Sequence, residues 1–160
     1  NKKSNIKLIQ GKSYHSKSSR KKVLIYGGAL KTGILTYNLM SYLNKFQNDN
    51  NHYFLNFYNH KVKASKDLLN VLPKNISYIT LQGPKDVLFK EWFSYQLYYR
   101  LGIYSKSIHN NIKTLFLREE KRLFPDMKFD IVIQYMGTNI TFLHLYALKD
   151  AKKYLFIHTR

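Results

Sequence analysis

A glycine-rich segment directly after the first apolar run is the part of the chain best suited to chemistry. Residues 23–26 (VLIY) are short and β-rich, and residues 27–33 (GGALKTG) follow them at once. The N–H groups at the start of a helix favour an anion, and glycine lets a ligand approach the backbone closely. This segment therefore predicts contact with a phosphate group.

The segment departs from the two common nucleotide-binding motifs. Gly28 and Gly33 have the spacing of a P-loop, but Ile34-Leu35 occupy the positions where Lys and Ser or Thr hold phosphates and Mg²⁺. The fingerprint GxGxxG is absent, and the second expected strand ends in YNH without an acid to bind a ribose. These departures argue against an ordinary ATPase, GTPase or NAD enzyme. A tight strand-to-helix turn without any ligand stays open as the alternative.

Composition narrows the classes of partner and cofactor. The 27 Lys and Arg against 9 Asp and Glu give a formal charge of +18, which favours an anionic partner such as nucleic acid, anionic lipid or a phosphorylated substrate. The chain has no Cys, and its six His residues lack ligand-like spacing, so we expect no metal site and no cofactor. No stretch approaches the roughly 18 apolar residues that span a bilayer.

Strand-like and helix-like segments alternate along the chain. We expect strands over residues 23–26, 52–58, 76–80, 130–135 and 153–157, and helices over 33–46, 65–72 and 141–147. Two further stripes at helical spacing, Val87 to Tyr99 and Ile108 to Phe116, predict two helices side by side. This order predicts an α/β fold, a Rossmann-like three-layer α/β/α arrangement with a mainly parallel sheet. Residues 1–20 are expected to be a basic linker or tail, and residues 21–160 one domain.

Two stretches resemble a known family. The segment KKVLIYGGALKTGILTYNLMSYLN resembles the opening of retaining two-domain (GT-B) glycosyltransferases, particularly family 4 members of bacterial cell envelopes and those that accompany teichoic-acid assembly. KFDIVIQYMG, a short helix and then AKKYLFIHTR are similar to the family's strand, small-residue turn and His-terminated strand. The resemblance implies the N-terminal, acceptor-binding lobe of a metal-independent enzyme. A second lobe, absent from this chain, would bind most of the nucleotide-sugar, and this lobe alone would be inactive.

The resemblance also implies roles for individual residues. On the donor side the diphosphate would be bound by Gly27, Gly28, Lys31 and Gly33. His158 would be the catalytic residue, placed against the transferred sugar, where it orients hydroxyls or stabilises charge; a strand-end His bonded to the backbone is the alternative. The acceptor would be bound by Gly137, Thr138 and Asn139.

Residues 85–106 mix many aromatic side chains with basic ones. Lys90, Trp92 and Arg100 in this stretch predict a patch for an anionic membrane or a lipid-linked acceptor, since basic helices with Trp and Tyr bind such surfaces. The alternative is that the rings pack between the two helices and cover the sheet. Glu119-Glu120, among basic neighbours, is expected to be a solvated helix end. The expected location is the cytoplasm, with peripheral attachment to the inner face of the membrane as an option.

The leading expectation is therefore the acceptor lobe of an enzyme that transfers a sugar from a nucleotide-sugar to a bacterial cell-envelope polymer or related glycan. One alternative is the lobe of a teichoic-acid glycerophosphotransferase, which shares the two-lobed design. A second is a non-catalytic basic module that docks on anionic membrane or polymer. Nucleic acid is disfavoured because no helix-turn-helix, zinc-finger or RNP signature occurs.

Overall fold

The computed structural model describes residues 8–9, 20–28, 33–58, 70, 72–73, 76–81, 86–137 and 139–157. The helix expected over residues 65–72 lies almost wholly outside them. The strands are β1 (Leu8–Ile9), β2 (Lys22–Tyr26), β3 (His52–Tyr58), β4 (Ile76–Leu81), β5 (Ile131–Gln134) and β6 (Lys152–Leu155). The helices are α1 (Ile34–Lys45), α3 (Phe89–Leu101), α4 (Lys106–Leu123) and α5 (Ile140–Ala147).

The chain divides into two compact units. One, here the sheet unit, comprises Asn1–Gln82 and Lys128–Arg160; the other, the helical unit, comprises Gly83–Met127. The single domain expected over residues 21–160 thus contains a helix pair that is compact by itself.

The sheet confirms the predicted α/β fold. Its strand order is β1-β4-β3-β2-β5-β6, in which the five strands from β2 to β6 are parallel and β1 pairs antiparallel with β4. The first parallel strand is central, the chain moves outward to β3 and β4, and then crosses to β5 and β6 on the other side. This is the strand order of the Rossmann fold. β1 lies within the segment expected to be a tail.

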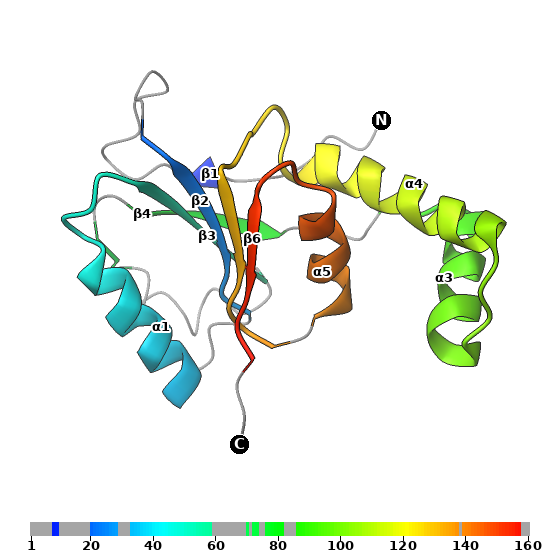
Figure 1. Cartoon of the computed structure of the whole chain (residues 1–160), viewed down its shortest axis with the longest axis horizontal. Helices are drawn as coiled ribbons and strands as arrows, with labels where there is room; N and C mark the ends of the chain where they lie inside the picture. The colour runs from blue at the N-terminus through cyan, green and yellow to red at the C-terminus, as the bar shows by residue number, and fades with distance from the viewer. Residues whose placement is uncertain are drawn as a thin grey trace. The chain divides into compact units, whose positions relative to one another are not determined.

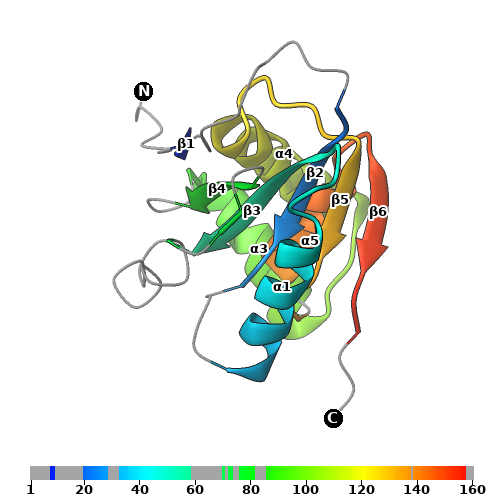
Figure 2. The same cartoon turned by 90° about the vertical axis from the view of Figure 1, so that its left-hand side faces the viewer.

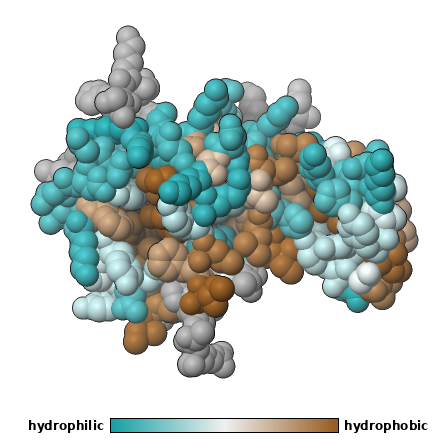
Figure 3. Space-filling model, viewed as in Figure 1, coloured by the Kyte–Doolittle hydropathy of each residue, from teal (hydrophilic) through white to brown (hydrophobic). Residues whose placement is uncertain are grey.

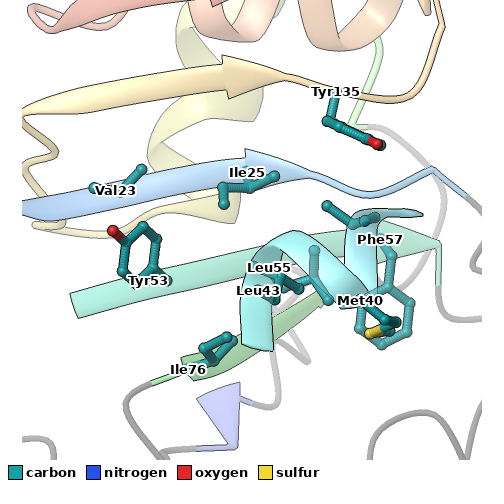
Figure 4. Close-up of a cluster of buried hydrophobic side chains, with 10 residues drawn as sticks. Val23, Ile25, Met40, Leu43, Tyr53, Leu55, Phe57, Ile76 and Tyr135 are labelled. Atoms are coloured by element: carbon teal, nitrogen blue, oxygen red, sulfur yellow. The ribbon is translucent and has the colours of Figure 1, made fainter. Parts of the chain in front are cut away.

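Helices cover both faces of the sheet, with α1 on one side and α5 on the other (Figures 1 and 2). Successive side chains of a strand point to opposite faces, so Val23 and Ile25 of β2 face α1. They join a buried cluster with Leu39 and Leu43, two members of the helical stripe expected over residues 33–46 (Figure 4). Burying such aliphatic side chains stabilises the fold by roughly 1.5–3 kcal/mol each.

The alternate residues of the same strands build the second core layer, toward α5. Tyr26 stacks on Phe142 with ring centroids 3.9 Å apart, and Phe54 meets Phe129 edge to face at 5.5 Å. Leu24 and Val132 are also buried on this face. The short apolar strands predicted from sequence are therefore buried on both faces, as parallel strands require.

The two helices of the helical unit are joined by polar contacts and by a ring contact between Tyr95 of α3 and Phe116 of α4, whose centroids are 6.3 Å apart. Glu91 of α3 is fully buried and accepts hydrogen bonds from the guanidinium of Arg118 and from the Leu88 amide. Asn111 of α4 donates to the Ser94 hydroxyl at 2.9 Å. These bonds hold α3 against α4.

Glu119 differs from expectation. It is 2% exposed rather than solvated, since its carboxylate accepts from Arg122 at 2.8 and 2.9 Å and from the Asp86 amide at 3.0 Å. The cation of Arg122, one helical turn away, and the Asp86 amide offset part of the cost of burying this carboxylate. Glu120 is half-buried.

Candidate functional site at the carboxyl edge of the sheet

The loops that follow β2 and β5 lie side by side. The two strands are parallel neighbours, paired from Val23 with Ile131 to Tyr26 with Gln134. The ladder continues one step further, where the Met136 N–H donates to the Tyr26 carbonyl at 3.2 Å. The strand order reverses between these strands, and ligands of open α/β sheets bind outside the carboxyl ends of the strands at such a point. The described glycine-containing segments predicted from sequence are therefore brought to one edge.

Gly28 is buried and has a structural reason to be glycine. Its φ of +68° lies in the left-handed region, and a Cβ at this position would be 2.9 Å from the Cβ of Met136. The close approach that glycine permits here is to the neighbouring loop. A contact of Gly28 with a diphosphate stays a prediction.

Gly27 is also buried, and its N–H donates to the Asn56 carbonyl at 2.8 Å. That N–H is thus engaged with β3, and a contact of Gly27 with a diphosphate stays a prediction. Gly33, in contrast, is exposed, directly precedes α1, and has no atom within 4 Å of its would-be Cβ. The first turn of α1 contains no acidic residue, so the positive end of the helix dipole is not offset by a local carboxylate.

The turn after β5 is held by the strand that precedes it. The Gln134 side-chain amide donates to the Gly137 carbonyl at 2.8 Å, and Gly137 has φ +63° and an exposed surface. Asn139, predicted to bind the acceptor, is the N-cap of α5: its side chain accepts from the Phe142 N–H at 3.3 Å. The side-chain oxygen of Asn139 is therefore used to begin the helix.

A row of polar side chains beneath this edge was not expected. Asn56 and Gln134 pair in register with either side of Tyr26, so all three point to the α5 face at the last rung of β2. Both amides are buried, and among the described residues the Asn56 side-chain atoms, the Gln134 Oε1 and the Tyr146 hydroxyl have no hydrogen-bond partner. The sequence pattern that could have predicted these buried amides is a single polar residue near the end of each apolar strand, as in HYFLNFY and DIVIQY.

Three predicted site residues, Lys31, Thr138 and His158, lie outside the described residues. The predicted patch of Lys90, Trp92 and Arg100 lies on α3 in the helical unit, where all three side chains are exposed. Trp92 and Arg100 line a surface groove of about 370 Å³, but Lys90 does not.

Within the part of the chain that the structure describes, no three His, Cys, Asp or Glu side chains are arranged to bind a metal ion. In the same part, no helix combines the length and apolar character that crossing a bilayer requires. Comparison with protein-family models and with curated protein sequences found no match to the chain. The class that fold and site define is thus a Rossmann-like α/β protein with two glycine-containing loops at its topological switch point.

Proposed function

We propose that this chain is the acceptor-binding lobe of a retaining, metal-independent glycosyltransferase that moves a sugar from a nucleotide-sugar to an anionic cell-envelope polymer or related glycan. The observation that supports this most is the adjacency of the loops after β2 and β5 at the topological switch point. The type of reaction in this proposal is taken from the resemblance of the same segments to cell-envelope glycosyltransferases.

Exposure suggests how the site would be divided. Gly33 and Gly137 are exposed at the edge, whereas Gly27 and Gly28 are buried, where Gly27 bonds to β3 and Gly28 approaches Met136. In the proposed enzyme the start of α1 and Lys31 contact the donor diphosphate, because helix N-termini and Lys bind phosphate. The turn at Gly137 and Thr138 contacts the acceptor.

His158 would act on the transferred sugar. β6 is parallel to β5, so the carboxyl end of β6, which precedes residue 158 in the sequence, lies at the same edge as the other two segments. Sugar transfer without a metal depends on positioning and on charge stabilisation, to which an imidazole contributes by hydrogen bonding the sugar hydroxyls.

The experiment is a transfer assay on the full-length protein with a poly(glycerol phosphate) acceptor and, in separate arms, UDP-sugars and CDP-glycerol. His158→Ala and Lys31→Ala should each lower turnover at least about tenfold, the loss of one positioning contact. His109→Ala and Lys113→Ala on α4 are the matched controls. Equal rates in all variants would reject the residue assignments, and turnover with CDP-glycerol alone would favour the glycerophosphotransferase.

Gly28→Val is a poor test of ligand binding. The valine side chain would collide with Met136 whether or not a ligand binds at this position. Lost activity in that variant would report misfolding.

A further inference from the structure

The orientation of α3 is the reverse of that expected for a helix in a soluble hairpin. Glu91 and Ser94 are its buried residues and face α4. On the opposite face, positions 89, 92, 93, 96 and 100 recur at spacings of three and four. Phe89 is 79% exposed, and Trp92 and Phe93 are about half exposed. The polar residues Glu91 and Ser94 are thus inside the unit, beside the contact of Tyr95 with Phe116, and the rings of Phe89, Trp92 and Phe93 are outside.

Further apolar side chains near the end of α3 are exposed in the same unit. Leu101 is 66% exposed and Tyr104 67% exposed, and hydrophobic surface is visible over this helix pair in Figure 3. The groove along α3 is lined by Trp92, Phe93, Gln96, Leu97, Arg100 and Leu101. Monomeric soluble proteins rarely expose so many adjacent apolar side chains without a partner.

The exposed charged side chains on α3 have one sign; the exposed Asp86, just before the helix, lies 3.8 Å from Arg118. α3 carries three charged side chains: Lys90 and Arg100 are exposed, while Glu91 is buried and neutralised by Arg118. Lys106, at the start of α4, adds another exposed cation. The aromatic surface is therefore flanked by positive charge with no exposed carboxylate on the helix.

We propose that this face of α3 docks on an anionic lipid bilayer, with Phe89, Trp92 and Phe93 inserted at the level of the headgroups. Aromatic rings that protrude from one helix suit an interface that has no fixed shape, and Trp prefers the boundary between headgroups and acyl chains. Each exposed Lys or Arg near an anionic membrane strengthens binding roughly fivefold. The net charge of +18 gives the whole chain the matching sign. This inference stands on the helical unit alone and does not depend on the proposed transfer reaction.

Trp92 makes the test direct, because it is the only tryptophan in the chain. Its fluorescence is recorded with vesicles of phosphatidylcholine alone and with vesicles containing equal parts of phosphatidylcholine and phosphatidylglycerol. The proposal predicts that the emission shifts to shorter wavelength only with the anionic vesicles, and that brominated lipid quenches it. Absence of both effects would overturn the proposal.

Paired variants separate insertion from general charge attraction. Phe89→Ser/Phe93→Ser should weaken vesicle binding about a hundredfold, or tenfold per ring. Ile34→Ser/Tyr37→Ser on α1, whose side chains are also strongly exposed at 77% and 74%, should leave binding unchanged. Lys90→Gln/Arg100→Gln should weaken it about thirtyfold, more than Lys113→Gln/Lys121→Gln on α4, which removes the same charge. Circular dichroism verifies the fold of each variant.

Two outcomes would identify a different role for the surface. Binding that survives the ring variants but disappears when residues 1–20 are deleted would show that the basic segment alone attracts the membrane. A dimer mass by light scattering that becomes a monomer in Phe89→Ser/Phe93→Ser would show that a second copy covers the surface. Either result overturns the membrane proposal.

Discussion

Gly28 and Met136 approach so closely that a Cβ on residue 28 would lie 2.9 Å from the Cβ of Met136. The contact joins the loops after β2 and β5, the two strands between which the strand order reverses. Since the Met136 atom concerned lies next to the backbone, it cannot move aside as a side-chain tip could. The same two residues therefore fix how the loops of the candidate site lie against each other.

Gly28→Ala should destabilise the protein by about 2–3 kcal/mol, through the collision with Met136 and the left-handed conformation together. Gly102→Ala is the control, since Gly102 has φ +66° but open space around it, and should cost only about 1 kcal/mol. Chemical unfolding monitored by circular dichroism measures both. Equal losses would show that the contact with Met136 has no energetic consequence.

Arg118→Met should destabilise the helical unit by about 3 kcal/mol. The substitution leaves the buried Glu91 carboxylate without its cation. An unpaired buried charge destabilises the fold by more than the intact ion pair stabilises it. Burial by itself would raise the pKa of Glu91. The hydrogen bonds from Arg118 and the Leu88 amide outweigh that effect, so the pKa lies below its usual value. The double variant Glu91→Leu/Arg118→Met should recover most of the loss, and a double variant as unstable as the single one would contradict this account.

Stability should fall as the pH drops from about 7 to about 5, because of His52. Burial, with the charges of Arg20 and Lys22, lowers its pKa below 6.5, and its Nε2 lies 2.9 Å from the Ser77 hydroxyl. The unfolded chain then takes up the proton first, so acidification favours unfolding. Melting temperatures across this range should decline less in His52→Gln. Parallel curves would remove His52 as the cause.

Tyr146→Phe should raise stability by up to about 1 kcal/mol, whereas Tyr53→Phe should lower it by about 1 kcal/mol. Within the described part of the chain the Tyr146 hydroxyl is buried without a hydrogen-bond partner, and burial raises its pKa well above the ordinary value. The Tyr53 hydroxyl donates to Asp49 at 2.6 Å, and burial together with this bond raises its pKa to about 12. The same change at two buried tyrosines should thus have opposite signs in thermal unfolding. Destabilisation in both would mean that the Tyr146 hydroxyl has a partner.

Much of the fold could be predicted because its signals are local. The strand over residues 52–58 has the same bounds in sequence and structure, since its aromatic and aliphatic residues, interrupted only by Asn56 after His52, lie between turn residues. The position of Gly28 and Gly137 at one edge also followed, because parallel strands place their carboxyl ends together. The contact with Met136 could not be foreseen, because it joins loops more than a hundred residues apart in sequence.

The orientation of α3 shows why the rest could not be predicted. Its apolar spacing left open whether the rings face outward or pack between the two helices, and Leu88 and Trp92 are about half exposed. The partners of Glu91 and Ser94 are Arg118 and Asn111, which belong to the next helix, and nothing in the local pattern of α3 reveals them. Long-range polar pairing here overrides the hydrophobic pattern.

The central claim is that the carboxyl edge between β2 and β5 binds the phosphate-bearing reactants. Amide NMR spectra of the 160-residue chain, titrated with UDP and separately with glycerol phosphate oligomers, test it most directly. We predict that the exposed Gly33 and Gly137 amides shift most, with smaller changes at the buried Gly27 and Gly28. Saturable shifts that spare this edge, or that appear only on α3 and α4, would contradict the claim.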